Sequence, residues 1–136
     1  MREKLKDCDA VVVGNNTFET AKTPLMKRNT IVFTSSAKDV EERHPHVWFI
    51  NPSEIDIVEF CREHNFETVA LLGGARTYGY FAGRNLIDDW YITIEPFLFG
   101  EGVPLTTGLE YELRRFKLVE IKQLNDAGAV LLHYQK

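Results

Sequence analysis

Three short runs of small, hydroxyl and amide residues follow apolar segments of this sequence, and they are its best candidates for ligand binding. They are Val13-Gly14-Asn15-Asn16-Thr17, Phe33-Thr34-Ser35-Ser36 and Leu72-Gly73-Gly74-Ala75-Arg76-Thr77. A helical pattern follows the first and the third. A helix start offers unpaired N–H groups and partial positive charge, and glycine lets an anion approach them without a Cβ in the way. Gly73 and Gly74 therefore predict a place where a pyrophosphate meets the backbone.

Each run also has a purely structural interpretation. A Gly-Gly turn between a strand and a helix is often only a tight connection, Gly14 can be only a turn, and Thr34-Ser35-Ser36 can be only a cap. Three such ends in one sheet favour a dinucleotide site over three unrelated turns. The Rossmann pattern G-x-G-x-x-G does not occur in the sequence.

The end of the second strand indicates which dinucleotide is preferred. An NAD site usually places Asp or Glu on the ribose hydroxyl. Here the strand is followed by the hydroxyls of residues 34–36, with Lys38 nearby and Asp39 farther along. Hydroxyl donors and a cation suit a 2′-phosphate, so NADP is preferred over NAD.

Other residues with reactive side chains are weaker candidates. His44-Pro45-His46 carries no further ligand at metal spacing, so a surface turn is expected and no metal site is predicted. Asp88-Asp89 is typical of a turn between a helix and a strand. Glu95 is either a carboxylate at an edge or rim or a polar group near a pocket. The spacing identifies no nucleophile with its base, so the catalytic residues stay unknown.

The elements that must position these residues alternate along the chain. Buried strands are predicted at 9–13, 30–34, 47–50 and 69–72, and a longer strand at 89–99. A first helix is predicted at 15–21 and ends before Pro24. A second helix begins at the N-cap Asn51, with Pro52 at its first position and Glu54 closing a capping box. A third helix is predicted at 75–83. Residues 116–124 and 129–135 flank the turn 125–128 and form a hairpin.

This order predicts an α/β fold with a mostly parallel central sheet flanked by helices and a C-terminal antiparallel hairpin at one edge. In such sheets ligands bind outside the carboxyl ends of the strands, where the three polar runs lie.

Composition restricts the class of protein. The 136 residues carry a formal net charge of −4 with scattered basic residues, which argues against nucleic acid or a membrane as partner. The sequence contains no apolar run of membrane-spanning length and no apolar signal core after Met1, so we expect one cytoplasmic domain. Cys8 and Cys61 are expected to be reduced packing residues.

Two longer segments resemble the dihydrofolate reductase superfamily. "VVVGNNTFETAKTPL" is similar to its strand, turn and helix, and "LLGGARTYGYFAGRNLIDDWYITIEPFLFGEGVPL" resembles both dihydrofolate reductase and, more closely in its second half, the reductase domain of riboflavin biosynthesis (RibD type). The resemblance covers roughly residues 2–136 in element order, and it is most specific over residues 72–105.

The resemblance implies NADPH as cofactor, bound across the three strand ends. Gly14, Asn15, Asn16 and Thr17 would contact phosphates, and Thr34, Ser35 and Ser36 would reach the adenosine side. The pyrophosphate and nicotinamide side would be held by Gly73, Gly74, Ala75, Arg76, Thr77 and Tyr78. The resemblance also implies a cis peptide between the two glycines.

The sequence departs from the family pattern at several places. Asn15 replaces an arginine that many dihydrofolate reductases use, and Leu72 stands where riboflavin-pathway reductases usually have Glu. The family's first strand lies upstream of the position that matches Met1, so the single domain 1–136 is expected without it. Another segment or subunit, or a rebuilt sheet, would then occupy that place.

The first functional hypothesis is an NADPH-dependent reductase of the riboflavin-pathway type, which reduces 5-amino-6-(5-phosphoribosylamino)uracil or a related small molecule. The alternative is a shortened, non-catalytic nucleotide-binding or assembly protein of the same fold, and a third is a structural domain without ligand. A homodimer through the aromatic strand 90–94, with Phe97 and Phe99, is a further expectation, although core burial would explain the same residues.

Overall fold

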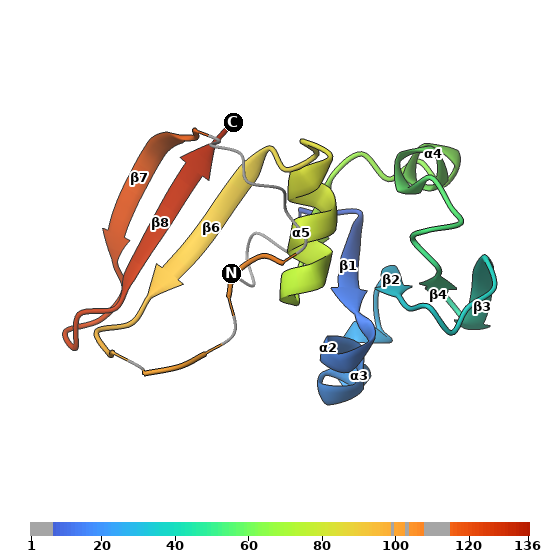
Figure 1. The fold of residues 1–136 in the computed structure, drawn as a ribbon, viewed down its shortest axis with the longest axis horizontal. Helices are drawn as coiled ribbons and strands as arrows, with labels where there is room; N and C mark the ends of the chain where they lie inside the picture. Colours follow the sequence, from blue (N-terminus) through green and yellow to red (C-terminus); the bar gives the residue numbers. More distant parts are fainter. Residues whose placement is uncertain (1–6, 99, 103, 108–114) are drawn as a thin grey trace. The chain divides into compact units, whose positions relative to one another are not determined.

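The computed structural model of the chain describes residues 7–98, 100–102, 104–107 and 115–136, and these residues form two compact units (Figure 1). Unit 1 is Met1–Tyr78 and unit 2 is Gly79–Lys136. The boundary falls within helix α5 (Ala75–Gly83). A single domain over residues 1–136 stays a prediction.

Unit 1 contains a five-stranded sheet with the order β3-β4-β2-β1-β5. Strands β1, β2, β4 and β5 are mutually parallel, and β3 is antiparallel to β4. The strands are β1 (Ala10–Gly14), β2 (Thr30–Phe33), β3 (Val40–His44), β4 (Val47–Ile50) and β5 (Val69–Leu71). All four residues of β2 are buried, which explains why Ile31, Val32 and Phe33 are apolar and why the Thr30 hydroxyl donates to the carbonyl of Leu25 at 2.6 Å.

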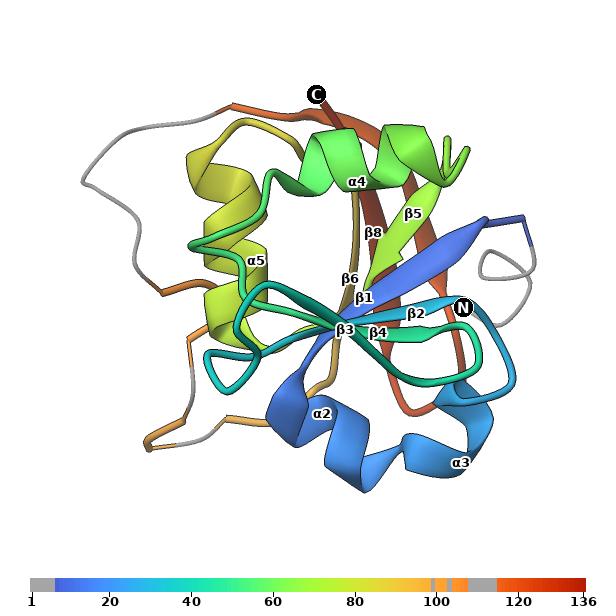
Figure 2. The same ribbon diagram turned by 90° about the vertical axis from the view of Figure 1, so that its right-hand side faces the viewer.

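Helices cover both faces of this sheet (Figure 2). Helices α2 (Asn15–Thr20) and α3 (Lys22–Leu25) lie on one face, where Phe18 meets Phe49 edge to face at 5.4 Å between ring centroids. Helix α4 (Ile57–Glu63) lies on the other, where Phe60 meets Trp48 at 5.8 Å. Parallel strands need both faces covered, so this arrangement is what the β-branched strands require.

Strand β3 was not predicted, because its sequence Val40-Glu41-Glu42-Arg43-His44 has little apolar character. It is an edge strand in which Glu42 and Arg43 are exposed, so its charges face water and protect the edge of the sheet. The turn expected at His44-Pro45-His46 is the two-residue connection between β3 and β4.

The start of the second predicted helix was wrong. Asn51 closes a local turn by accepting hydrogen bonds from the backbone N–H and the hydroxyl of Ser53. The N-cap of α4 is Asp56, whose carboxylate accepts from Val58 N at 3.0 Å and Glu59 N at 3.3 Å. Val58, in the first turn of α4, is 40% exposed, whereas Ile57 and Phe60 are buried.

Two other features differ from prediction. The helix predicted at 15–21 is α2, which ends at Thr20, before Pro24 as expected, but the separate short helix α3 that contains Pro24 was not predicted. The long strand expected over 89–99 ends at Ile94, just before the sequence Glu95-Pro96, and proline cannot donate to a strand ladder. Phe99 lies outside the described residues.

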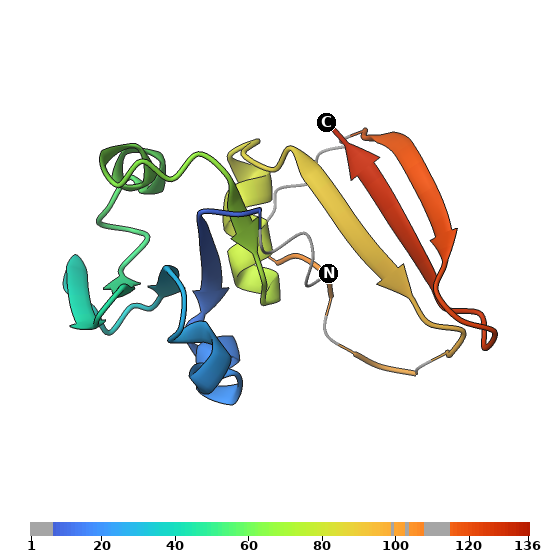
Figure 3. The same cartoon turned by 180° about the vertical axis from the view of Figure 1, so that it is seen from behind.

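Unit 2 contains a three-stranded antiparallel sheet in which β8 lies between β6 and β7 (Figure 3). Its strands are β6 (Asp89–Ile94), β7 (Lys117–Gln123) and β8 (Val130–Gln135). The predicted hairpin of β7 and β8 is confirmed, and the Asn125 side chain closes it by accepting from Gly128 N and Ala129 N, both at 3.1 Å. The hairpin joins β6 in a sheet of its own, whereas an edge of the parallel sheet was expected.

The predicted α/β class, mostly parallel with antiparallel strands at the C-terminal end, is confirmed. Cys8 and Cys61 are free thiols, as the sequence predicted. Among the helices of the described residues, none combines the length and the hydrophobicity that a bilayer crossing requires.

Candidate functional site

The carboxyl ends of β1 and β5 form a topological switch point. From β1 the chain moves to β2 and β4 on one side, and it returns to β5 on the other side of β1. Ligands of open α/β sheets bind at such a point, because the two loops diverge and leave a crevice. Gly14 ends β1 there, and Gly73 and Gly74 follow β5. Two of the three predicted strand ends therefore lie side by side.

The two glycine runs are joined directly by a backbone hydrogen bond. Gly14 N donates to the carbonyl oxygen of Gly73 at 2.8 Å. The peptide between Gly73 and Gly74 is cis, which confirms what the resemblance implied. Gly73 has φ +105°, a backbone conformation that L side chains rarely adopt. The glycine run is thus required by the backbone itself.

The two neighbouring glycines face different surroundings. A Cβ at Gly14 would lie 3.3 Å from Thr77 Oγ1 and 3.6 Å from Gly74 N, so Gly14 is needed for close packing. A Cβ at Gly74 would meet no atom within 4 Å, so the exposed Gly74 borders open space. Bare backbone next to open space is the arrangement that an approaching phosphate group needs.

The first turn of α5 contacts the glycines through a hydrogen bond and through side chains. Tyr78 N donates to the Gly74 carbonyl at 3.0 Å, which is the first helical hydrogen bond. Thr77 is 5% exposed and packs toward Gly14. The ring of Tyr78 lies close to Gly73, and burial raises the pKa of its phenol. Arg76 is exposed and Ala75 half-buried.

Helix α2 begins directly after Gly14, as predicted. Its N-cap is Gly14, which has no side chain to bond the first N–H groups. Asn15 and Asn16 are exposed and Thr17 is half-buried. The first turn of α2 therefore presents amide and hydroxyl side chains beside the switch point.

The end of β2, the third predicted strand end, is next to that of β1 in the sheet. Thr34 Oγ1 lies 3.0 Å from Ser36 Oγ and accepts from Ser36 N at 3.2 Å, so these hydroxyls are organised in a local turn. Ser35 and Ser36 are exposed. The backbone N–H of Lys38 donates to a carboxylate oxygen of Glu41 at 3.0 Å, a neighbour that sequence reasoning did not anticipate.

A second polar cluster, in unit 2, was missed. His133 Nε2 lies 2.8 Å from Asp89 Oδ1, and the His133 ring stacks on Tyr91 at 4.2 Å between centroids. Asp89 is the first residue of β6, where the strand predicted at 89–99 was expected to begin, but its pairing with His133 was not anticipated. The pairing of β6 with β8 brings together Asp89 and His133, which are 44 positions apart in the sequence. The only sequence signal for this contact is the alternation of side chains along the two strands. Across the described part of the chain, no group of three or more His, Cys, Asp or Glu could hold a metal ion.

Known proteins are similar to this chain in sequence and in fold. Residues 1–130 match the family described as the RibD C-terminal domain. The chain belongs to this family. A relative in Bacillus subtilis (strain 168), the uncharacterized protein YwjB, is 30% identical over 131 residues, which cover 93% of this chain and 72% of YwjB.

Solved structures of the RibD type share the fold. A protein assigned to riboflavin biosynthesis from Shewanella sp. PV-4 has a TM-score of 0.82 at 23% identity. The match covers 99% of this chain and 77% of the Shewanella protein. The Thermotoga maritima diaminohydroxyphosphoribosylaminopyrimidine deaminase/5-amino-6-(5-phosphoribosylamino)uracil reductase has a TM-score of 0.72 at 18% identity. The match covers 99% of this chain and 48% of the Thermotoga protein. At these identities the likeness establishes the RibD-type reductase fold.

Proposed function

We propose that this RibD C-terminal domain protein is an NADPH-dependent reductase of the riboflavin-pathway type. Its substrate would be 5-amino-6-(5-phosphoribosylamino)uracil or a small molecule of the same class. The family supports this, as does the fold shared with a Thermotoga protein named for that reductase activity. The observation that carries the proposal is the glycine turn at the switch point of the sheet, where Gly14 N donates to the Gly73 carbonyl at 2.8 Å and Gly74 borders open space.

The residues at this site fit a dinucleotide. Gly74 leaves open space where a side chain would stand, so a phosphate group can reach the backbone of the turn. Each hydrogen bond to a charged group contributes roughly 1.5–3 kcal/mol, so a few amides would hold a pyrophosphate. Phosphates would be held by Gly14, Asn15, Asn16 and Thr17, the adenosine side by Thr34, Ser35 and Ser36, and the remainder by Gly73, Gly74, Ala75, Arg76, Thr77 and Tyr78.

When bound, NADPH supplies the hydride that reduces a carbonyl or imine carbon of the substrate, and a proton completes the reduction. The protein's own part is to orient the two reactants and to exclude water. The glycine turn would contribute to the orientation, because it leaves its backbone accessible to the cofactor at Gly74.

Titration calorimetry with NADPH and, separately, NADH tests the cofactor site first. We expect micromolar binding of NADPH and weaker binding of NADH, because the hydroxyls after β2 suit a 2′-phosphate. Loss of nicotinamide absorbance with the pyrimidine substrate then tests catalysis. Binding without turnover would favour the non-catalytic nucleotide-binding alternative, and no binding of either nucleotide would refute the reductase proposal.

We also propose that the protein forms a homodimer through unit 2. One face of its sheet carries Trp90, Ile92 and Ile94 of β6 and, across β8, Leu118 and Ile121 of β7. Ile94, Leu118 and Ile121 are 51%, 45% and 61% exposed. Several exposed apolar side chains on one face of a sheet are typical of an interaction site.

A further inference from the structure

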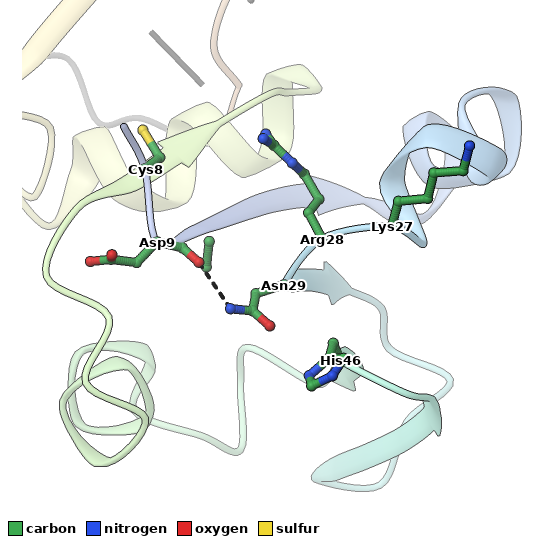
Figure 4. Close-up of a pocket in the computed structure, with 7 residues that line it drawn as sticks. Cys8, Asp9, Lys27, Arg28, Asn29 and His46 are labelled. Carbon is green, nitrogen blue, oxygen red and sulfur yellow. Dashed lines mark hydrogen bonds between the residues drawn. The ribbon is translucent and has the colours of Figure 1, made fainter. Parts of the chain in front are cut away.

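Unit 1 has a second candidate site at the amino ends of its parallel strands. A pocket of about 300 Å³ lies there. Its polar lining consists of Cys8, Asp9, Lys27, Arg28, Asn29 and His46 (Figure 4). These residues lie just before the first residues of β1, β2 and β4. The glycine turn and the hydroxyl runs instead follow the carboxyl ends of the strands of the same sheet. The pocket is therefore distinct from the proposed cofactor site.

The pocket carries a local excess of basic groups in a protein whose net charge is −4. Lys27 and Arg28 are adjacent, and His46 adds an imidazole from the β3–β4 turn. The acidic residue of the lining, Asp9, is already engaged, because its carboxylate accepts from Glu67 N at 2.8 Å and Thr68 N at 3.0 Å. Figure 4 shows this carboxylate directed away from Lys27 and Arg28.

The backbone holds the lining residues in place. The carbonyl of Asn29 accepts from Val11 N at 3.0 Å, and its side-chain amide donates to the carbonyl of Asp9 at 3.1 Å. The carbonyl of His46 accepts from Thr30 N at 2.9 Å, and the His46 N–H donates to Glu42 at 3.3 Å. The two bonds between backbone groups extend the β-ladder beyond the strand starts and fix the backbone of Asn29 and His46.

His46 occupies a position that usually favours a different residue. Its φ is +64°, and it is the second residue of the Pro45-His46 connection, where a turn normally prefers glycine or asparagine. Left-handed conformations of other residues often mark functional positions. A histidine here brings a hydrogen-bonding ring to the pocket.

We propose that this pocket binds the phosphate group of a small phosphomonoester. An arginine, a lysine, an imidazole and a side-chain amide provide the donors that phosphate oxygens accept, and arginine matches phosphate with two parallel hydrogen bonds. A volume of about 300 Å³ is at the lower end of the range of small-molecule sites, which suits a phosphorylated sugar rather than a dinucleotide.

Cys8 makes the pocket directly testable. Both cysteines are partly exposed, so iodoacetamide alkylation at Cys8 reports on occupancy while Cys61 serves as the internal control. The probes are ribose 5-phosphate and inorganic phosphate, titrated at constant ionic strength with potassium chloride, and calorimetry measures the same binding. We expect either probe to slow Cys8 alkylation at least threefold without changing Cys61.

The matched variants are K27Q/H46N and K22Q. Asparagine tolerates the conformation of His46, and Lys22 is a lysine of the neighbouring α3 that does not line the pocket. We expect K27Q/H46N to bind ribose 5-phosphate at least tenfold more weakly with a melting temperature within a few degrees of the parent, and K22Q to bind as the parent does. Unprotected Cys8, or equal phosphate affinity in K27Q/H46N, would overturn the proposal and place any bound phosphate elsewhere.

Discussion

A Cβ atom at Gly14 would lie 3.3 Å from the hydroxyl oxygen of Thr77. This close approach, together with the 2.8 Å hydrogen bond from Gly14 N to the Gly73 carbonyl, joins the end of β1 to the start of α5. The backbone of Gly14 has φ −76° and ψ 162°, which any residue adopts. Space, and not backbone conformation, is therefore what limits a side chain at this position.

The first prediction is that G14A is destabilised by overpacking. The added methyl group would crowd the Thr77 hydroxyl, which must give by a few tenths of an ångström, and overpacking typically costs about 1–3 kcal/mol. Urea unfolding of G14A, T77A and the double variant measures the coupling. We expect the cost of G14A to fall in the T77A background. Additive effects would show that Thr77 is not what excludes the methyl group.

The second prediction concerns Gly74, where the added Cβ would contact no protein atom within 4 Å. We expect G74A to weaken NADPH binding at least tenfold, because its methyl group would stand between the backbone and the pyrophosphate. G100A is the matched control, since a Cβ at Gly100 also meets nothing within 4 Å. Both variants are compared by calorimetry and circular dichroism. Unchanged NADPH affinity in folded G74A would remove this turn from the cofactor site.

The third prediction separates the observed helix cap from the one expected from sequence. Asp56 bonds the N–H groups of Val58 and Glu59, so D56A is expected to lose about 1 kcal/mol of unfolding free energy. Glu54 would close the capping box predicted from Asn51, yet the helix starts only at Ile57. Denaturant unfolding of E54A should therefore match the parent. A larger loss in E54A than in D56A would contradict the observed cap.

The fourth prediction is a pH dependence centred on Asp9. Backbone hydrogen bonds from Thr68 and Glu67 lower the pKa of this carboxyl group in the folded protein. A lowered folded-state pKa stabilises the fold at pH values above the unfolded-state pKa, and this stabilisation is lost as the pH falls below about 4. The parent should therefore melt above D9N at pH 7, and the difference should shrink at pH 3.

The control for Asp9 is D126N, a carboxyl group in the exposed turn between β7 and β8. Its melting temperature should follow that of the parent at both pH values. A difference between parent and D9N that is equally large at pH 3 and pH 7 would mean that the charge of Asp9 does not stabilise the fold.

The fifth prediction tests the proposed homodimer. Ile121 is 61% exposed on the apolar face of the unit 2 sheet, so I121K should leave the fold intact and convert a dimer to a monomer. T93K is the control, because Thr93 is exposed on the opposite face of the same sheet. Sedimentation velocity distinguishes the two states. A monomeric parent protein would refute the dimer proposal.

Much of the fold can be predicted from sequence because local patterns of apolar and turn residues determine it. The apolar runs of β1, β2 and β4 are long enough and sufficiently β-branched to be recognised without their neighbours. The hairpin turn at Asn125 is equally local. Strand β3 escaped prediction because its charged sequence becomes a strand only by pairing with β4.

For the candidate site, too, local sequence patterns and long-range contacts determine different features. The amino-acid sequence by itself determined which residues follow the strands, and hence the glycine, amide and hydroxyl runs of the proposed cofactor site. Only the tertiary structure decided that β5 returns beside β1, which places Gly73 against Gly14. Likewise, only strand pairing brought His133 to Asp89, and only the sheet order gathered Lys27, Asn29 and His46 around one pocket. The physical reason is that local patterns encode which residues are buried, while sites depend on contacts between residues far apart in the chain.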